Sequence, residues 1–228
     1  MVDLHTHILP NMDDGASGIK ESLALLKAEK EQGVDTVVLT PHFRREHETV
    51  EQFLRRRQES YETLCAALPP DAPKLVLGAE VAWFENLVYE PQLSSLVLGN
   101  SRYILLELPK TVWKSKLPDQ IYQFAGVSGL TPILAHLDKY DEPGNRAAIR
   151  TLVEMQFPMQ MSADAFSKPF TRCRATRMMK RGAWLLGSDC HNTARRPCMY
   201  GMAAEYVKKH IPGAEYILNL YGADKRAL

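Results

Sequence analysis

The sequence is poor in cysteine, in excess charge and in long apolar runs, and each shortage excludes a class of protein. It has 4 cysteines in 228 residues and no Cys-x-x-Cys pair. That is too few for a disulfide framework, and it predicts a reducing, cytoplasmic compartment. Lys and Arg number 28 against 27 Asp and Glu, so no net charge drives binding to nucleic acid or to an anionic membrane. The longest apolar stretches fall far short of the ~20 residues of a membrane-spanning helix, and we expect neither membrane insertion nor, without a charged and apolar leader, export.

The chain has enough apolar material for one folded unit. Hydrophobic residues make up 45% of the sequence, which is ordinary for a globular protein. A length of 228 residues exceeds the typical ~150 residues per domain only modestly. No internal repeat, Ser/Gly linker or low-complexity segment divides the chain. We therefore predict a single domain spanning residues 1–228.

Short apolar runs alternate with longer helical patterns along the chain. The first helical pattern follows Ser17, a possible N-cap, and the second follows Thr49, which can form a capping box with Gln52. Similar patterns cover about 119–128, 143–156, 170–182 and 199–210, whereas 83–102 is too broken to assign. Seven β-rich runs lie between them: Val2 to Leu4, Thr36 to Leu39, Leu75 to Gly78, Tyr103 to Leu106, Pro132 to Ala135, Pro158 to Met161 and Ala183 to Gly187.

This alternation predicts an α/β fold. Continuous apolar strands separated by helices are typical of a parallel sheet covered on both faces. Seven such strands are enough to close a distorted (β/α)7, TIM-like barrel, which is our first choice. An open doubly wound sheet would give the same pattern, and the sequence does not distinguish the two.

Polar side chains of metal-ligand type follow six of the seven predicted strands. In an α/β barrel the carboxyl ends of the strands meet at one mouth, so these side chains would face one another. The other two histidines, His47 and His210, are predicted at the surface. The residues that follow the strands are His5 and His7, His42, Glu80, Glu107, His136, and Asp189 with His191.

This placement predicts a metal site. His5 and His7, like Asp189 and His191, are two residues apart and point to the same side of an extended chain. Any one of them could be an ordinary polar residue, but chance does not explain their joint position at strand ends. Imidazole and carboxylate together suit Zn²⁺, Mn²⁺ or Fe²⁺. With Asp13 or Asp14 from the first loop, the set is large enough for two or three ions.

The motifs that contain these residues resemble those of a known family. The motifs are similar to those of the PHP (polymerase and histidinol phosphatase) superfamily. Within it they resemble the manganese-dependent tyrosine-protein phosphatases of capsular and exopolysaccharide operons, the CpsB/CapC type. The resemblance runs from residue 3 to about 198 and rests on Asp3-Leu4-His5-Thr6-His7-Ile8-Leu9-Pro10, Asp13-Asp14-Gly15, Thr40-Pro41-His42, Gly78-Ala79-Glu80, Glu107-Leu108-Pro109, Ala135-His136 and Ser188-Asp189-Cys190-His191-Asn192.

The resemblance implies a trinuclear centre, most naturally of Mn²⁺ with Fe or Zn as alternatives, on a PHP-type barrel. Motif matching assigns His5, His7, Glu80 and Asp189 to the first ion. Glu80 would bridge to a second ion held also by Glu107 and His136. The third would be held by Asp14, His42 and His191.

The resemblance also implies two phosphate-binding side chains. Arg196, followed by Pro197, stands where the family has a phosphate-binding arginine. The family usually reads Ala-His-Pro-Glu-Arg-Tyr where this chain has Ala135-His136-Leu137-Asp138-Lys139-Tyr140. Lys139 keeps the positive charge there but cannot form the bidentate hydrogen bonds that a guanidinium makes with phosphate.

The predicted function is hydrolysis of phosphotyrosine on proteins. Clustered divalent ions would lower the pKa of a bridging water, and the resulting hydroxide would attack phosphorus in line. The resemblance implies a bacterial tyrosine kinase of polysaccharide synthesis as the phosphoprotein partner. A further set of residues is predicted on loops at the same mouth, where they either contact an anionic peptide or form an ordinary solvated rim: Arg44, Arg45, Lys110, Trp113 and Lys114.

Three alternatives stay open. A PHP phosphoesterase could act instead on a small phosphate such as histidinol phosphate, a sugar phosphate or a nucleotide. The chain could also be a metal-stabilised binding barrel without activity. Finally, Cys190 and Arg196 have the Cys-x5-Arg spacing of cysteine-dependent phosphatases. The segment between them has no glycine to cradle phosphate, which favours a packing role for Cys190.

Overall fold

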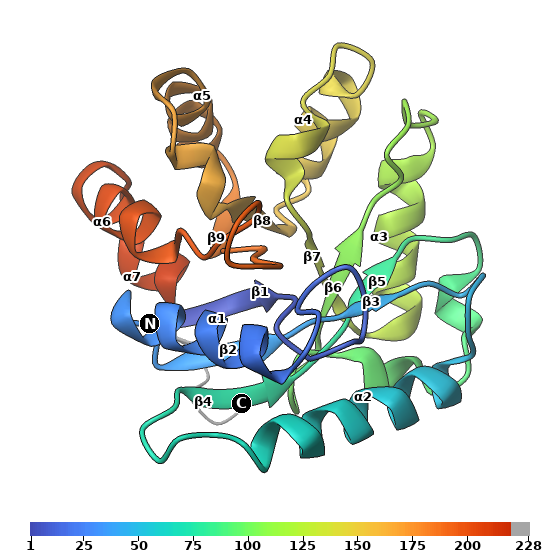
Figure 1. Ribbon diagram of the computed structural model, residues 1–228. Helices are drawn as coiled ribbons and strands as arrows, with labels where there is room; N and C mark the ends of the chain where they lie inside the picture. Colours follow the sequence, from blue (N-terminus) through green and yellow to red (C-terminus); the bar gives the residue numbers. More distant parts are fainter. Residues whose placement is uncertain (220–228) are drawn as a thin grey trace.

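Strands and helices alternate along the chain, as the apolar pattern predicts (Figure 1). The computed structural model describes residues 1–219, so the end of the predicted domain, residues 220–228, lies outside the described residues. All strand pairings are parallel. The predicted α/β class is therefore confirmed.

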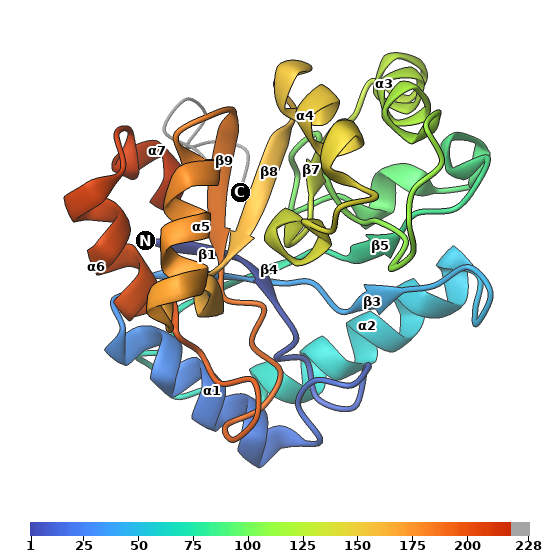
Figure 2. The same ribbon diagram turned by 90° about the horizontal axis from the view of Figure 1, so that it is seen from above.

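The strands form two sheets. One has the order β1-β2-β4 and the other the order β3-β5-β6-β7-β8-β9. Seen from above, they lie at the centre of the molecule with helices outside them (Figure 2). The strands are β1 (Val2–Thr6), β2 (Thr36–Leu39), β3 (His42–Phe43), β4 (Lys74–Leu77), β5 (Glu80–Ala82), β6 (Tyr103–Glu107), β7 (Thr131–Leu134), β8 (Pro158–Ser162) and β9 (Ala183–Gly187).

The seven predicted strands are all present, and two short strands that were not predicted, β3 and β5, follow two of them. β3 follows β2 after Thr40 and Pro41, and β5 follows β4 after Gly78 and Ala79. Pro41 has no N–H to donate to a ladder. A Cβ at Gly78 would come within 2.8 Å of the Leu98 side chain, so glycine lets the second break pack closely against Leu98. The two breaks transfer the chain from the first sheet to the second, just where His42 and Glu80 are presented.

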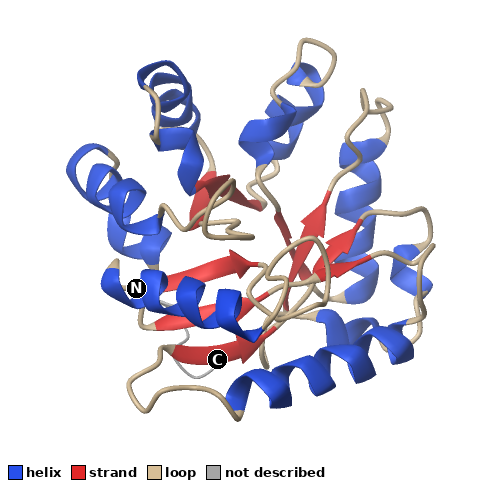
Figure 3. Cartoon of the chain, viewed as in Figure 1, coloured by secondary structure: helices blue, strands red, loops and turns tan. Residues whose placement is uncertain are grey.

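The helices surround the strands (Figure 3). The structure gives α1 (Ile19–Glu31), α2 (Val50–Cys65), α3 (Leu117–Ser128), α4 (Arg146–Glu154), α5 (Pro169–Met179), α6 (Tyr200–His210) and α7 (Ala214–Leu218). Residues 1–219 also include the 3₁₀ turns η1 (Leu87–Tyr89), η2 (Leu93–Leu96), η3 (Leu137–Tyr140) and η4 (Ala163–Phe166). None of the described helices is both long and apolar enough to cross a membrane.

Of the two predicted helix N-caps, the one at Thr49 is confirmed and the one at Ser17 is wrong. The capping box of α2 is confirmed, because Thr49 Oγ1 accepts from Gln52 N at 3.2 Å and Gln52 Oε1 accepts from Thr49 N at 2.9 Å. The N-cap predicted at Ser17 is wrong. The capping residue of α1 is Gly18, and Ser17 Oγ instead donates to Glu21 Oε2 at 2.7 Å.

The apolar core lies on both sides of the strands. A large cluster packs between the strands and the surrounding helices. A smaller buried cluster joins residues of both sheets: Leu4, Val38, Val76, Leu98, Leu105, Ile133, Ala135 and Leu185. Strands buried on both faces explain why the sequence reads as continuous apolar runs rather than as alternation.

Candidate metal centre

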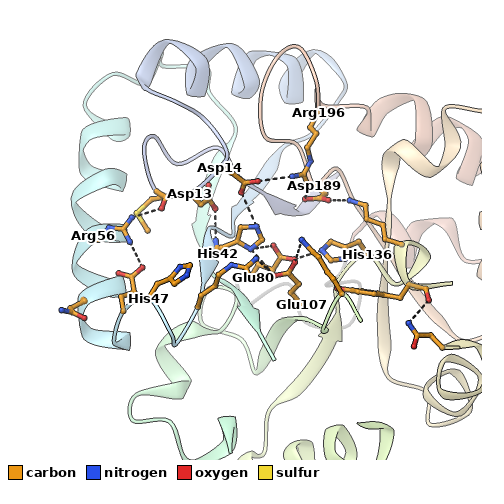
Figure 4. Close-up of a pocket in the computed structure, with 18 of the residues that line it drawn as sticks. Asp13, Asp14, His42, His47, Arg56, Glu80, Glu107, His136, Asp189 and Arg196 are labelled. Carbon is orange, nitrogen blue, oxygen red and sulfur yellow. Dashed lines mark hydrogen bonds and ion pairs between the residues drawn. The ribbon is translucent and has the colours of Figure 1, made fainter. Parts of the chain in front are cut away.

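The carboxyl ends of the strands bring the predicted ligands together at one mouth. His5 lies on β1, His42 and Glu80 begin β3 and β5, and Glu107 ends β6. The others follow β1, β7 and β9 in loops. Three groups of side chains place one ligand atom each within 4.8 Å of the others: His5, His7 and Glu80; His42, Glu80 and Glu107; and His7, Asp14, His42 and His191. Figure 4 shows the members of this cluster that line a cavity, among them Asp14, His42, Glu80 and Glu107.

The first group and Asp189 together have four ligand atoms that face one another. The Nε2 atoms of His5 and His7 are 3.1 Å apart, and each lies 3.2 Å from Glu80 Oε2. Asp189 Oδ1 lies 3.6 Å from both nitrogens. Asp189 has a φ of 54°, and a non-glycine residue in this left-handed region is held there by its surroundings.

Hydrogen bonds behind the two rings fix which nitrogen faces the cluster. His7 Nδ1 lies 2.7 Å from Asp13 Oδ2 and His5 Nδ1 lies 3.1 Å from Gln160 Oε1. Gln160 Oε1 also accepts from His136 N, while its Nε2 donates to two carbonyls, so the amide orientation is determined. Both Nδ1 atoms therefore donate a proton, and the two Nε2 atoms are left to face the cluster.

These four atoms require a positive charge among them. In neutral rings both Nε2 atoms are acceptors, like the two carboxylate oxygens, so nothing in the group donates to anything else. A divalent ion with ligands at about 2.1 Å keeps tetrahedral donors about 3.4 Å apart and cis octahedral donors about 3.0 Å apart. The observed separations of 3.1 to 3.6 Å match this range. The residues present therefore fit a divalent metal ion.

The pKa values of these groups follow from the same need for positive charge. Burial alone would lower the pKa of His7, but Asp13 and Glu80 raise it to about 10. The pKa of Glu80 is held well below its usual range, because the positive charge of His5 and the contacts of His136 and His42 outweigh burial. The pKa of Asp189 is lowered in the same way, with His5 and Lys139 outweighing burial. Paired shifts of this kind in a cavity are typical of functional sites.

Glu80 spans the cluster. Its Oε2 faces His5 and His7 and lies 3.0 Å from His42 Nδ1, while its Oε1 lies 2.8 Å from His136 Nε2. Oε2 is buried and forms no hydrogen bond in the described chain. A carboxylate whose two oxygens face different histidines has the geometry of a bridge between ions.

His42 lies close to ligands of two ions in the partition that the resemblance implies. That partition groups His136 with Glu107, and His42 with Asp14 and His191. In the structure His42 Nδ1 lies 3.6 Å from Glu107 Oε2, and His42 Nε2 lies 3.5 Å from Asp14 Oδ1. His42 thus stands between the second and third groups, and the contact that His136 makes is with Glu80.

Asp14 and His191 complete the third group. His191 Nδ1 donates to the Asp189 carbonyl at 3.0 Å, which leaves its Nε2 facing Asp14 Oδ1 at 3.5 Å. That Nε2 is buried without a hydrogen-bond partner in the described chain. Burial and the charge of His7 lower the pKa of His191 to about 3. The ring is therefore neutral at physiological pH, and its Nε2 lone pair is free to bind a metal ion. A Cβ at Gly15 would meet the His7 carbonyl at 2.2 Å, so this loop packs against His7 only with glycine there.

Both predicted phosphate-binding side chains reach the cluster. Lys139 Nζ contacts Asp189 Oδ2, and Arg196 Nη2 lies 2.8 Å from Asp189 Oδ1. Arg196 Nη1 also lies 3.6 Å from Asp14 Oδ2. Two cations that share one carboxylate at the edge of the cavity are in position to meet an anionic group above the cluster.

The cavity above the cluster has a volume of about 940 Å³. Of the predicted rim residues, Arg44 and Lys110 line it, and both pair with Glu107, at 2.9 and 3.2 Å. Trp113 does not face the cavity as a rim residue would. It is 7% exposed, and its indole N–H donates to the Pro109 carbonyl at 2.8 Å. His47 is exposed as predicted and lines the cavity, and His210 is exposed.

Sequence reasoning missed two supporting residues. Gln160 orients His5 from β8, and its signal is a buried polar side chain inside an apolar strand. Asp13 was considered only as a possible ligand. In the structure it accepts from His7 Nδ1, Gly15 N and His42 N, and so holds the loop and two of the histidines. Such partners fix the tautomer and direction of a ligating ring.

Cys190 does not line the cavity. It is fully buried, and its Sγ lies 3.5 Å from Glu29 Oε1. Burial, together with the charges of Glu29 and Asp3, raises the pKa of this thiol well above its usual range. A nucleophilic cysteine needs the opposite environment. The Cys-x5-Arg spacing is thus a coincidence of sequence.

Comparison with known proteins agrees with this picture. The family described as capsular polysaccharide synthesis, CpsB/CapC, matches residues 1–227. Tyrosine-protein phosphatase CpsB of Streptococcus pneumoniae is 28% identical over 226 residues, covering 92% of this chain and 90% of that protein. Tyrosine-protein phosphatase YwqE of Bacillus subtilis is 26% identical over 227 residues, covering 94% and 86%.

Solved structures share the fold. A structure from work on YwqE of Bacillus subtilis and CpsB of Streptococcus pneumoniae, described as unique metal-dependent tyrosine phosphatases, superposes with a TM-score of 0.77 at 22% identity, covering 96% of this chain and 94% of that one. Histidinol phosphate phosphatase of Lactococcus lactis, complexed with zinc, L-histidinol and phosphate, has a TM-score of 0.54 at 12% identity, with coverage of 91% and 92%. With a family match over nearly its full length, the chain belongs to the CpsB/CapC family of capsular polysaccharide synthesis.

Proposed function

We propose that this protein is a metal-dependent phosphatase that hydrolyses phosphotyrosine on proteins. The observation that carries the proposal is a group of four facing acceptors, His5 Nε2, His7 Nε2, Glu80 Oε2 and Asp189 Oδ1. Glu80 and Asp189 line a cavity that cationic side chains also line. The four acceptor atoms suit divalent ions, and the cationic side chains suit a phosphate ester. The relatives named tyrosine-protein phosphatase support the choice of substrate.

The metal proposal is three ions, with Mn²⁺ first and Fe or Zn as alternatives. His5, His7, Glu80 and Asp189 would hold the first ion; Glu80, Glu107 and His136, with His42 nearby, the second; and Asp14, His42 and His191 the third. All of these donors are nitrogen or oxygen, and the absence of thiolate suits Mn²⁺. When bound, such ions lower the pKa of water and neutralise phosphoryl oxygens.

The chain itself supplies orientation and charge. Asp13 and Gln160 fix the rings of His7 and His5, so their donor atoms need no rearrangement when the site fills. We propose Arg196 and Lys139 as the catalytic residues that contact the phosphoryl group and stabilise its charge in the transition state. A phenol with a pKa of about 10 leaves more readily than an alkyl alcohol, so no strong general acid is required from the chain.

The proposed partner is a phosphotyrosine protein, in the first place a bacterial tyrosine kinase that controls polysaccharide synthesis. The family description, capsular polysaccharide synthesis, supports this choice. We place the reaction in the reducing cytoplasm, which agrees with four free cysteines in the described chain.

The same proposal includes one domain, residues 1–228, built as a distorted seven-stranded barrel. The inner apolar cluster, which joins Leu4 of the first sheet to Leu105 and Leu185 of the second, supports a common interior. Hydrogen bonds from His7 N to the Cys190 carbonyl at 2.9 Å and from Asp189 N to the His5 carbonyl at 2.8 Å tie β1 to the end of β9.

A substrate panel tests the function. The purified chain, loaded with Mn²⁺, is assayed on a phosphotyrosine peptide, the matching phosphoserine peptide, histidinol phosphate and p-nitrophenyl phosphate. We expect the highest kcat/KM on the phosphotyrosine peptide. A higher value on histidinol phosphate would assign a small-molecule phosphoesterase instead, and no turnover of any substrate with the metal bound would indicate a binding protein.

A further inference from the structure

The cavity extends beyond the candidate ligands toward α2. Its volume of about 940 Å³ lies near the top of the ~300–1,000 Å³ range of small-molecule sites, and one phosphorylated side chain does not fill it. Figure 4 shows His47 and Arg56 on the α2 side, with His42, Glu80 and His136 deeper in the site. This outer wall is formed by Arg44, His47, Glu48, Gln52, Arg55 and Arg56.

Arg55 is the unpaired cation of this wall. Arg56 is held by Glu48 Oε1 at 2.5 Å and by the Met12 carbonyl at 2.8 Å, and Arg44 is held by Glu107. Arg55 lines the cavity, is exposed, and makes no hydrogen bond or ion pair with any other residue of the described chain. Its guanidinium is therefore available to a ligand that enters the cavity.

An unpaired carboxylate of the described chain, Glu142, lines the cavity from the segment between η3 and α4. Glu142 lines it beside Tyr140 and Asn145, and its side chain is exposed and forms no ion pair within residues 1–219. The other lining cations, Lys110, Lys139 and Arg196, are already paired with Glu107 or Asp189, so a carboxylate that enters the cavity is attracted by Arg55 and repelled by Glu142. An extended peptide that crosses the mouth would meet opposite charges before and after the residue inserted at the metal site.

We propose that Arg55 binds an acidic side chain of the substrate, located on one flank of the phosphotyrosine only. The substrate class is then an acidic phosphotyrosine peptide with a fixed direction across the site. Guanidinium and carboxylate form a paired, directional contact that lysine or glutamine does not reproduce. This inference rests on the proposed phosphotyrosine phosphatase function.

Peptide kinetics test it. Three phosphotyrosine peptides are compared, with alanine on both flanks, with glutamate on the amino-terminal flank, and with glutamate on the carboxyl-terminal flank. We expect one of the two acidic peptides to have a kcat/KM about two- to fivefold above that of the alanine peptide, which is the gain typical of a solvent-accessible ion pair. The gain should shrink as salt is raised, because the pair is screened.

Variants identify the residue. Arg55→Gln should bring the acidic-to-alanine ratio close to one. Arg55→Glu should invert it, so that a lysine-flanked peptide becomes the better substrate. Arg45→Gln is the matched control, since Arg45 is a nearby cation outside the cavity wall, paired with Glu90 at 3.0 Å, and it should keep the wild-type ratio.

The outcomes separate this inference from the function on which it rests. Equal kcat/KM values for the three peptides, or a ratio unchanged in Arg55→Gln and Arg55→Glu, would overturn the role of Arg55 while leaving phosphotyrosine hydrolysis intact. If no phosphotyrosine peptide is hydrolysed, the proposed function fails. Fluorescence anisotropy with the same labelled peptides then still measures whether Arg55 favours the acidic one.

Discussion

The Nε2 atoms of His5 and His7 lie 3.1 Å apart, although the Nδ1 proton of each ring is already donated elsewhere, to Gln160 and Asp13. Two imidazole nitrogens at this distance, with Glu80 and Asp189 beside them, are stable only with a positive charge between them. Without metal that charge is a proton, and with metal it is the ion. Metal binding and protonation therefore compete for the same atoms.

This competition predicts proton release on metal binding. His7 has a pKa of about 10 in the metal-free chain, so it is protonated at pH 7.5 and must lose that proton to bind an ion. Calorimetric titration with Mn²⁺ at pH 7.5, in two buffers of different ionisation enthalpy, should show release of about one proton or more per molecule. Apparent enthalpies that are equal in both buffers would contradict this.

The same pKa values set the pH range in which the metal-free chain is stable. His7 has a raised pKa, so its contribution is complete below about pH 6.5 and is lost as pH rises toward 10. Glu80 and Asp189 have lowered pKa values, so their contributions are present above about pH 4.5 and are lost as pH falls. Thermal unfolding with chelator should give the highest Tm between about pH 5 and 6.5. Added Mn²⁺ should move this optimum to higher pH.

Gln160 should matter for metal binding although it is not a predicted ligand. Gln160→Leu removes the acceptor that fixes His5, and such supporting residues typically change metal affinity about 10- to 100-fold. Gln123→Leu, a comparable change at an exposed position of α3, is the control. Competition with a chelating dye measures both affinities. Equal affinities would show that His5 is oriented without Gln160.

Glu80 and Asp14 should differ in the number of ions they affect. Glu80 faces His5, His7, His42 and His136, whereas Asp14 is 66% exposed and its ion pairs in the described chain are with His42, His191 and Arg196. Glu80→Gln should therefore lower metal content by two ions, and Asp14→Asn by no more than one. Elemental analysis of both variants decides this. The same loss in both would contradict the bridging role of Glu80.

Cys190 should be dispensable for catalysis. Its thiol is fully buried and its pKa is raised by burial and by Glu29. Cys190→Ala should keep kcat/KM within a few-fold of wild type, because the change removes no group that reaches substrate. Iodoacetamide should label exposed Cys173 well before Cys190. A loss of activity beyond about a thousandfold with full metal content would instead indicate a thiolate mechanism.

The sequence predicts which residues meet but not how they share the ions. Parallel strands end at one mouth, so His5, Glu80 and Asp189 could be expected together without coordinates. Two features depend on atomic packing instead. The break at Pro41 places His42 between two groups of ligands, which no spacing rule encodes. Gln160 is 155 residues from the ring that it orients, and a single sequence gives no sign of such a pair.

Outside the site the mismatches have local causes. The box formed by Thr49 and Gln52 is a contact between neighbours in sequence and is therefore predictable. The N-cap of α1 moves to Gly18 because the hydroxyl of Ser17 is taken by Glu21. Trp113 was expected at the rim. Its indole finds a carbonyl acceptor beneath the surface, and burial of a large ring then outweighs the polar loop around it.

Arg196 should contribute more than Lys139 to binding the phosphate. Both contact Asp189, but only Arg196 also reaches toward Asp14, and only a guanidinium can hold two phosphate oxygens in a fixed geometry. A charge-assisted hydrogen bond contributes roughly 1.5 to 3 kcal/mol, so Arg196→Ala should lower kcat/KM on a phosphotyrosine peptide by about 10- to 100-fold. Lys139→Ala should lower it less, and Lys139→Arg should raise it if the larger head group fits beside Asp189. Metal content is measured in all three variants, because loss of a partner of Asp189 could act through the metal. A larger defect in Lys139→Ala than in Arg196→Ala, at equal metal content, would show that the phosphate is held chiefly by the lysine.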